Sequence, residues 1–159
     1  MKIAKKQNDD GTLSSEFEQE FRIFQAAMQR DGASLRAHDN LVSVVGFCKQ
    51  PQAVLYEWVG GGDLQSLLED PEMRQATPLA KRIGLILDAA RGLEQLHYRS
   101  SVVIRHNDIK PQNIMLVVGL SSAKLADYGA AKAHVVGRVA SVSLLAGTLE
   151  YMCPHAVNT

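Results

Sequence analysis

The sequence lacks the features of several large protein classes. Only two cysteines, Cys48 and Cys153, occur among the 159 residues, and they form no C-x-x-C pair. Neither a disulfide framework nor a zinc site is therefore indicated. No run approaches the ~20 apolar residues of a membrane span, and the N-terminal MKIAKKQNDDG has no apolar signal core. We therefore expect an intracellular chain with no membrane segment.

An excess of charge of one sign is also missing. Seventeen basic residues balance seventeen acidic ones. This balance removes the broad positive field that non-specific binding to nucleic acid requires, so no nucleic-acid partner is expected. With 46% hydrophobic residues, the chain can still bury a core, and one globular unit is the expectation.

The first half of the chain predicts one helix followed by strands. Residues 14–30 carry an apolar stripe at helical spacing, formed by Phe17, Phe21, Phe24 and Met28. The stretches LVSVVGFC (41–48) and AVLYEWV (53–59) are rich in β-branched and aromatic residues and predict two strands. After GGGD, Asp63 is placed to cap a short helix that ends before Pro71.

The second half predicts a long helix and three short strands. Thr77 and Pro78 form a helix start, and apolar residues then recur with the helical period as far as His97. The short apolar pieces SVVI (101–104), IMLVV (114–118) and AKLA (123–126) each suit a strand. From Asp127 onward no period persists, which predicts a long loop.

A polar cluster lies between the first two of these strands, in RHNDIKPQNIML (105–116). Asp108 can accept a proton from a hydroxyl, Lys110 can neutralise a phosphate, and Asn113 can offer an oxygen to Mg²⁺. Asp127, in DYG at the end of another strand, suits the same metal ion. Together these residues predict a phosphoryl-transfer site.

The chain resembles a protein kinase. HNDIKPQN is similar to the catalytic loop of the family, which implies that Asp108 is the catalytic base, that Lys110 contacts the transferred phosphate and that Asn113 binds metal. DYG resembles the metal-binding motif, with Asp127 as its aspartate and Tyr128 in the usual place of phenylalanine. The cofactors implied are ATP and Mg²⁺, and the partners are a nucleotide and a protein substrate.

Other stretches carry the resemblance through the chain. IAKK is similar to the family's V-A-I-K, which implies that Lys6 contacts the ATP phosphates, and Glu20 matches the helix glutamate that pairs with that lysine. YEWVGGGDL resembles the hinge with Tyr56 as gatekeeper, and GTLEYMCP the end of the activation segment. The nucleotide-binding residues implied here are Glu57 and Val59 through their backbone, Asp63 at the ribose, and Met115.

The resemblance also implies the fold and the subclass. The expected fold is α+β, a partial two-lobed kinase with residues 1–59 in the N-lobe and residues 60–159 in the C-lobe. Lys110 and Thr148 favour a serine/threonine kinase, and HDNLVSVVGFC and LDAARGLEQLH resemble the receptor-like branch. The chain is then expected in the cytoplasm, or on the cytosolic side of a receptor-like protein if it is a fragment.

The sequence departs from the family pattern in three places. It contains no G-x-G-x-x-G, and it stops soon after Pro154, so we expect a kinase truncated at both ends. Asn107 stands where the pattern has arginine, so a phosphorylated activation segment would lack that partner.

Each residue role has an alternative. Lys6 can be a solvated lysine, Glu20 can lie on a charged surface, and Asp108 with Asn113 can cap a loop. For the whole chain, the alternative to a kinase is a catalytically weak or inactive, pseudokinase-like binding module.

Overall fold

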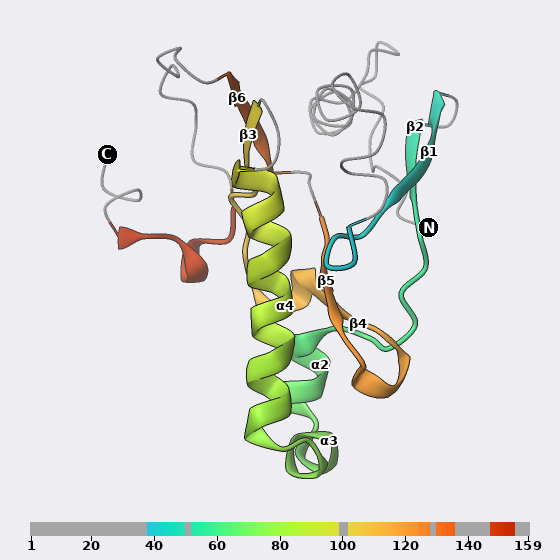
Figure 1. The fold of residues 1–159 in the computed structure, drawn as a ribbon, viewed down its shortest axis with the longest axis vertical. Helices are drawn as coiled ribbons and strands as arrows, with labels where there is room; N and C mark the ends of the chain where they lie inside the picture. Colours follow the sequence, from blue (N-terminus) through green and yellow to red (C-terminus); the bar gives the residue numbers. More distant parts are fainter. Residues whose placement is uncertain (1–37, 50–51, 99–101, 128–129, 136–146, 155–159) are drawn as a thin grey trace.

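The structure is a computed structural model that describes residues 38–49, 52–98, 102–127, 130–135 and 147–154 (Figure 1). The elements are β1 (Val44–Lys49), β2 (Gln52–Tyr56), α2 (Leu64–Glu69), α3 (Pro71–Ala76), α4 (Leu79–Tyr98), β3 (Val102–Arg105), β4 (Ile114–Leu116), β5 (Ala123–Leu125) and β6 (Lys132–Val135). Three short 3₁₀ turns, η1 (Pro111–Asn113), η2 (Val118–Leu120) and η3 (Leu149–Tyr151), join them. The predicted helix over residues 14–30 lies outside the described residues.

The strands form three antiparallel pairs, β1 with β2, β3 with β6, and β4 with β5. Five of the six strands fall on the stretches that the sequence predicts. The prediction of a long loop from Asp127 onward is wrong, because β6 and η3 lie within it. Cross-strand pairing with β3 gives β6 its structure, and this long-range contact leaves no periodic pattern in so short a strand.

Two short helices follow the GGGD turn. Asp63 caps α2 as predicted, accepting a hydrogen bond from the Ser66 N–H at 2.8 Å. Helix α3 was not predicted, although Asp70 followed by Pro71 is a helix-start signal; Asp70 accepts bonds from the N–H groups of Glu72 and Met73 at 2.9 and 3.0 Å. Thr77 ends α3 and does not cap α4, which begins at Leu79.

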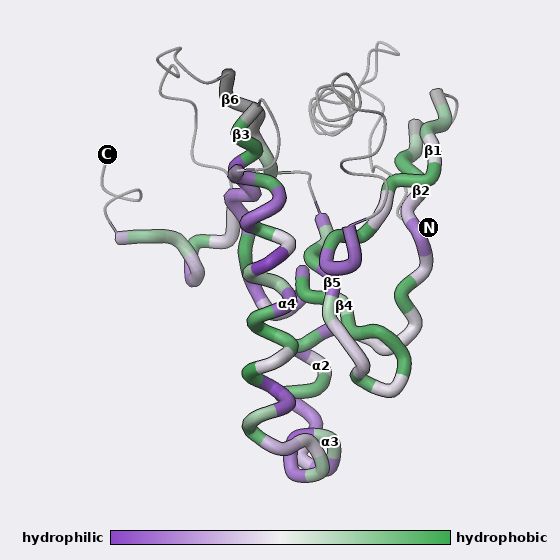
Figure 2. The backbone as a smooth tube through the Cα atoms, in the orientation of Figure 1, coloured by the Kyte–Doolittle hydropathy of each residue, from purple (hydrophilic) through white to green (hydrophobic). Residues whose placement is uncertain are grey.

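Helix α4 runs along the described part of the chain, with α2 and α3 near its first turns and the β3–β6 pair near its last (Figure 1). It buries one face, made of Leu85, Ala89, Gly92 and Leu96. Apolar residues also occupy a second, exposed face, where Ile83, Ile86 and Leu87 are each about half exposed (Figure 2). The helical period therefore identified the helix, but not which of its faces is buried.

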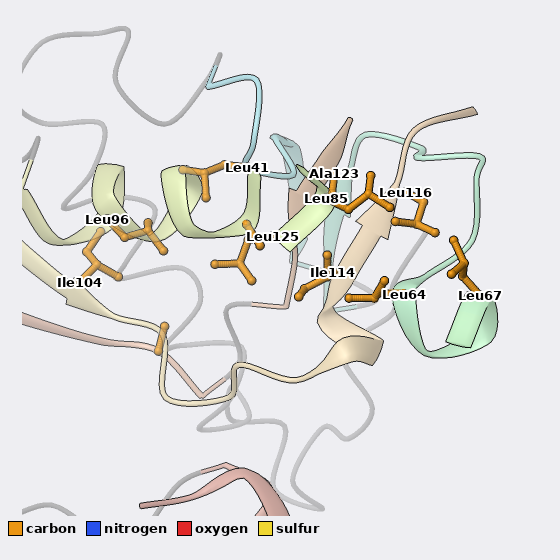
Figure 3. Close-up of a cluster of buried hydrophobic side chains, with 12 residues drawn as sticks. Leu41, Leu64, Leu67, Leu85, Leu96, Ile104, Ile114, Leu116, Ala123 and Leu125 are labelled. Carbon is orange, nitrogen blue, oxygen red and sulfur yellow. The ribbon is translucent and has the colours of Figure 1, made fainter. Parts of the chain in front are cut away.

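The core gathers side chains from α2, α4 and the strands behind the predicted site. Figure 3 shows its members converging from these elements. They are Leu41, Leu64, Leu67, Leu85, Ala89, Leu96, Ile104, Ile114, Leu116, Ala123, Leu125 and Ala131. Burying one such leucine side chain stabilises a fold by about 1.5–3 kcal/mol. Because Ile104 and Ile114 belong to this core, the loop between them is anchored at both ends.

Residues 40–42 join β1 to the rest of the core. The Val42 N–H donates to the Leu125 carbonyl, and the Leu125 N–H donates to the Asn40 carbonyl, each at 2.9 Å. The Asn40 side chain also donates to the Ala123 carbonyl at 3.0 Å. A Cβ at Gly92 would overlap the Asn40 carbonyl oxygen, so glycine on α4 permits this approach.

Candidate active site

The 106–113 loop is positioned from beneath by His106, whose side chain is 1% exposed. The Asp108 N–H donates to its Nδ1 at 3.3 Å, so Nδ1 is the acceptor and Nε2 carries the proton. Nε2 lies 2.9 Å from the Ala126 carbonyl oxygen, to which it then donates. Burial lowers the pKa of His106, although the Ala126 bond and the nearby Asp127 and Asp108 oppose this shift. The ring is therefore a neutral structural group, as the sequence predicts.

Asp108 is held by three groups. Lys110 Nζ lies 2.8 Å from its Oδ2, and the Thr148 N–H and hydroxyl donate to its Oδ1 at 2.9 and 2.7 Å. Burial raises the pKa of Asp108, but hydrogen bonds from Lys110, Thr148 and Asn113 outweigh it, so the pKa lies below its ordinary value. Asp108 is therefore a carboxylate at neutral pH, the form that can accept a proton.

Thr148 completes the network from a distant part of the sequence. Lys110 Nζ donates to its hydroxyl oxygen at 2.7 Å, and this hydroxyl in turn donates to Asp108. Gly147 permits the approach, because its φ is +128° and a Cβ there would overlap the Asn107 carbonyl oxygen. The sequence predicted this bridge, and the structure brings the three residues together.

Asn113 lies buried beside Asp108. Its Nδ2 donates to the Asp108 carbonyl at 2.8 Å and to Oδ2 at 3.0 Å. Because the amide nitrogen makes both bonds, the amide oxygen faces away from Asp108. The Asn113 carbonyl accepts a bond at 2.8 Å from Ala126 N–H, which places Asp127 next in the chain beside Asn113.

These two residues fit a hard divalent cation. Asp127 has a φ of +66°, which aspartate tolerates better than most residues, and a carboxylate and an amide oxygen are ligands that Mg²⁺ accepts. Within the described residues, no group of three or more His, Cys, Asp or Glu side chains gathers. A cation here would thus take two protein ligands and complete its shell with water or phosphate oxygens, as Mg²⁺ commonly does.

The 57–63 segment links β2 to α2 and runs beside β4. The Gly61 N–H donates to the Leu116 carbonyl and the Leu116 N–H to the Gly62 carbonyl, each at 2.8 Å. An isolated antiparallel bridge pairs Asp63 with Met115, so these two predicted nucleotide-binding residues are neighbours. The Asp63 carboxylate is already bonded to Ser66 at the start of α2, a cap that a ribose contact would have to share or displace.

Glu57 makes side-chain contacts that the sequence did not suggest. Its Oε1 accepts bonds from the Ser43 N–H at 2.7 Å and from Lys124 Nζ at 2.9 Å. Burial raises the pKa of Glu57, but the bonds from Lys124 and Ser43 outweigh it and lower the pKa overall. Glu57 thus ties β5 to the start of β1. The following Val59 is buried.

The remaining predicted residues cannot be placed. Lys6, Glu20 and Tyr128 lie outside the described residues. One further contact escaped the sequence analysis: the Asn107 side chain donates to the Ala130 carbonyl at 3.1 Å. No motif points to Asn107, because the family pattern has another residue there.

Comparison with known sequences decides the family. A sequence model described as "Protein kinase domain" matches residues 1–159, the whole chain. The chain is a member of the protein kinase family. The α+β strands and helices agree with a partial two-lobed kinase fold.

Curated relatives are plant receptor-like kinases. A probable leucine-rich repeat receptor-like protein kinase of Arabidopsis thaliana is 36% identical over 92% of this kinase chain, and a receptor protein kinase of Oryza sativa subsp. japonica is 31% identical over 99%. Chitin elicitor receptor kinase 1 of Arabidopsis thaliana is 40% identical over 76%. The chain spans only 17%, 17% and 19% of their respective lengths.

Membership of the family brings its general chemistry. Protein kinases use ATP with a divalent metal ion and act on protein substrates. Among the names of the relatives are serine/threonine protein kinases, so the subclass suggested by Lys110 and Thr148 is confirmed as a family resemblance. None of the helices in the described ranges is both long and apolar enough to cross a bilayer.

Proposed function

We propose that this kinase chain binds ATP with Mg²⁺ and transfers the γ-phosphate to serine or threonine hydroxyls of a protein. The observation that carries the proposal is the network of Asp108, Lys110, Asn113 and Thr148, beside which Asp127 follows Ala126. It gathers a proton acceptor, a cation for phosphate and two metal-ligand oxygens in one place, from parts of the chain 40 residues apart. A loop cap would need only Asp108 and Asn113.

Each residue has a distinct task in the proposed reaction. Asp108 takes the proton from the attacking hydroxyl while the new oxygen–phosphorus bond forms and the bond to ADP breaks. Lys110 stabilises the charge on the transferred phosphate, and Thr148 keeps Lys110 and Asp108 in register. Asn113 and Asp127 would hold Mg²⁺, which offsets charge on the phosphate oxygens when bound.

Nucleotide binding is proposed for the 57–63 segment and its neighbours. The backbone groups of Glu57 and Val59 would bind adenine, and Asp63 and Met115 would lie at the ribose and base. The side chain of Glu57 faces Ser43 and Lys124, which leaves its backbone role as the one to test. By resemblance, Lys6 and Glu20 would orient the phosphates, with residues 1–59 as the N-lobe part and residues 60–159 as the C-lobe part.

Phosphate transfer to a generic protein substrate tests the base. Asp108→Asn keeps the shape of the side chain but removes the proton acceptor, so activity should fall roughly 10²–10⁴-fold. Asp39→Asn, an exposed aspartate at the edge of the same domain, is the matched control and should leave activity unchanged. Equal activity in wild type and Asp108→Asn would refute the assignment.

A second function is a binding module that lacks phosphate transfer. The exposed apolar face of α4, with Leu79, Ile83 and Ile86 about half exposed or more, favours it, because such surface marks contact with other proteins. Thermal-shift measurements with ATP and Mg²⁺ separate the two. A rise in Tm that is lost in Asp127→Asn would count against a module without nucleotide.

The cellular setting is proposed from the relatives. Because they carry the names of receptor-like kinases, we propose that this chain acts on the cytosolic side of a receptor-like protein, or in the cytoplasm. Fractionation of cells that produce the natural full-length protein tests this placement.

A further inference from the structure

Asn107 has no task in the proposed chemistry, yet it lies where two distant segments meet. Strands β3 and β6 pair in a regular register from Val102 with Val135 to Arg105 with Lys132. Continued by two residues, the same register places Asn107 opposite Ala130. The strand pair therefore leads directly from the core to the 106–113 loop.

The backbone leaves the strand pair at Asn107, and the side chain replaces it. Asn107 has a φ of +62°, a left-handed conformation that asparagine adopts more readily than most residues. Its Nδ2 donates to the Ala130 carbonyl at 3.1 Å. A side-chain amide thus supplies the donor that a further backbone pair would have given, while the chain turns toward Asp108.

The backbone of the same residue contacts a second segment. A Cβ at Gly147 would overlap the Asn107 carbonyl oxygen, so the two backbones are in close contact. Gly147 precedes Thr148, whose N–H and hydroxyl both bind Asp108. Asn107 therefore touches Ala130 on one side and the residue before Thr148 on the other.

We propose that Asn107 is a positioning residue that fastens both flanks of the 131–146 segment to the 106–113 loop, and that it does so without a phosphate group. The bond joins a neutral amide to a backbone carbonyl, so no phosphorylated residue is needed to form it. An arginine at this position would instead offer a charge for a phosphate to bind. The proposal rests on the proposed kinase function, because it assigns a means of regulation to that site.

Three variants separate the side-chain bond from the backbone conformation. Asn107→Asp keeps the shape and tolerates the positive φ, but it cannot donate to Ala130. Asn107→Gly accepts the positive φ and removes the side chain altogether. Gln112→Ala removes an exposed amide from the same loop and is the matched control.

Amide hydrogen exchange on the whole chain tests the contact independently of activity. In Asn107→Asp and Asn107→Gly, the amides of residues 130–135 and of Thr148 should exchange about two- to five-fold faster, the scale of one exposed neutral hydrogen bond. The amides of β4 and β5 should not change, and Gln112→Ala should match wild type. If Asn107→Gly exchanges like wild type, only the backbone conformation matters and the proposal is overturned.

Kinetics test the consequence for the site. Both Asn107 variants should lower kcat about two- to five-fold while the KM for ATP stays constant, because Thr148 and Asp108 are affected and the 57–63 segment is not. Phosphatase treatment should leave wild-type kcat unchanged. A loss of kcat on that treatment would overturn the phosphate-free fastening.

The two proposals fail in different ways. A wild-type chain that transfers no phosphate contradicts the proposed function, while the exchange rates still decide whether Asn107 fastens the segment. An active chain whose exchange rates do not respond to Asn107→Asp contradicts only the positioning role.

Discussion

The 106–113 loop and the 57–63 segment each border on one lysine–carboxylate ion pair of nearly equal length. Lys110 lies 2.8 Å from Asp108, and Lys124 lies 2.9 Å from Glu57, with similar exposure of the two lysine side chains, 21% and 18%. Around Lys110, side chains bind other side chains. Around the 57–63 segment, backbone groups bind the backbone of β4, and Lys124 only adds to them. Similar ion pairs can thus belong to a reaction site in one region and to a structural junction in the other.

Removing each lysine is the strongest test of this comparison. Lys110→Ala takes away the cation beside Asp108 and Thr148, so kcat should fall roughly 10²–10³-fold, as for other lost electrostatic donors. Lys124→Ala should leave kcat almost unchanged. Steady-state phosphate transfer by both variants decides the matter, and equal losses would remove the distinction between the two pairs.

Thr148 tests whether the loop depends on side-chain bonds. Thr148→Ala loses a hydroxyl that donates to Asp108 and accepts from Lys110, and bonds to charged groups are worth about 1.5–3 kcal/mol, so kcat should fall roughly 10–100-fold. Thr148→Ser keeps the hydroxyl and should retain most activity. Comparable losses in the two variants would show that the methyl group, and not the hydroxyl, is needed.

Gly61 tests whether the 57–63 segment depends on its backbone. A Cβ there would overlap the Leu116 carbonyl, so Gly61→Ala should lower the free energy of unfolding by about 1–3 kcal/mol. Gly84→Ala on α4 is the control, since nothing lies within 4 Å of its Cβ position, and it should raise the free energy of unfolding by about 0.5–1 kcal/mol. Urea unfolding measures both, and an unharmed Gly61→Ala variant would deny the close backbone pairing.

The pH dependence of stability tests the neutral ring under the loop. The folded pKa of His106 lies below its ordinary value, so the unfolded chain binds the proton first as the pH falls below about 6.5. The contribution of His106 to the free energy of unfolding is therefore complete above that pH and is lost below it. Tm measured from pH 7.5 to 5.5 should fall, and His106→Gln should flatten this slope. An unchanged slope in the variant would assign the pH dependence to other groups.

The smallest effect is expected for Glu57. Glu57→Gln removes the charge of a partly exposed ion pair, which is worth about 0.2–1 kcal/mol of unfolding free energy and less at high salt. Denaturation at low and at 1 M salt should show the difference shrink. A cost that salt does not reduce would mean that the bond to the Ser43 N–H, and not the charge, matters.

The same comparison explains what the sequence revealed. Asp108, Lys110, Asn113 and Thr148 were found because their task depends on their side chains, and residue identity is what a sequence displays. The contacts of Gly61 and Gly62 with Leu116 use backbone groups that every residue has, and only the glycines hint at them. The prediction for Glu57 considered its backbone alone, so its bonds to Ser43 and Lys124 were missed.

The errors in the fold have a similar origin. Strand β6 depends on β3, which lies about 30 residues earlier, so no local pattern reveals it. Helix α4 was recognised from its period, but its apolar residues cover two faces, and the period could not say which of them Leu85 and Leu96 share with the core. Both cases are decided by packing between distant parts of the chain.

His106 has one more consequence. Its imidazole touches the backbone of Asp108 through one nitrogen and that of Ala126, the neighbour of Asp127, through the other. The spacing between the two segments that carry these acidic residues is thus set by the width of a five-membered ring. Replacing it with a shorter or longer side chain would shift both acids at once, even though the ring itself never meets a substrate.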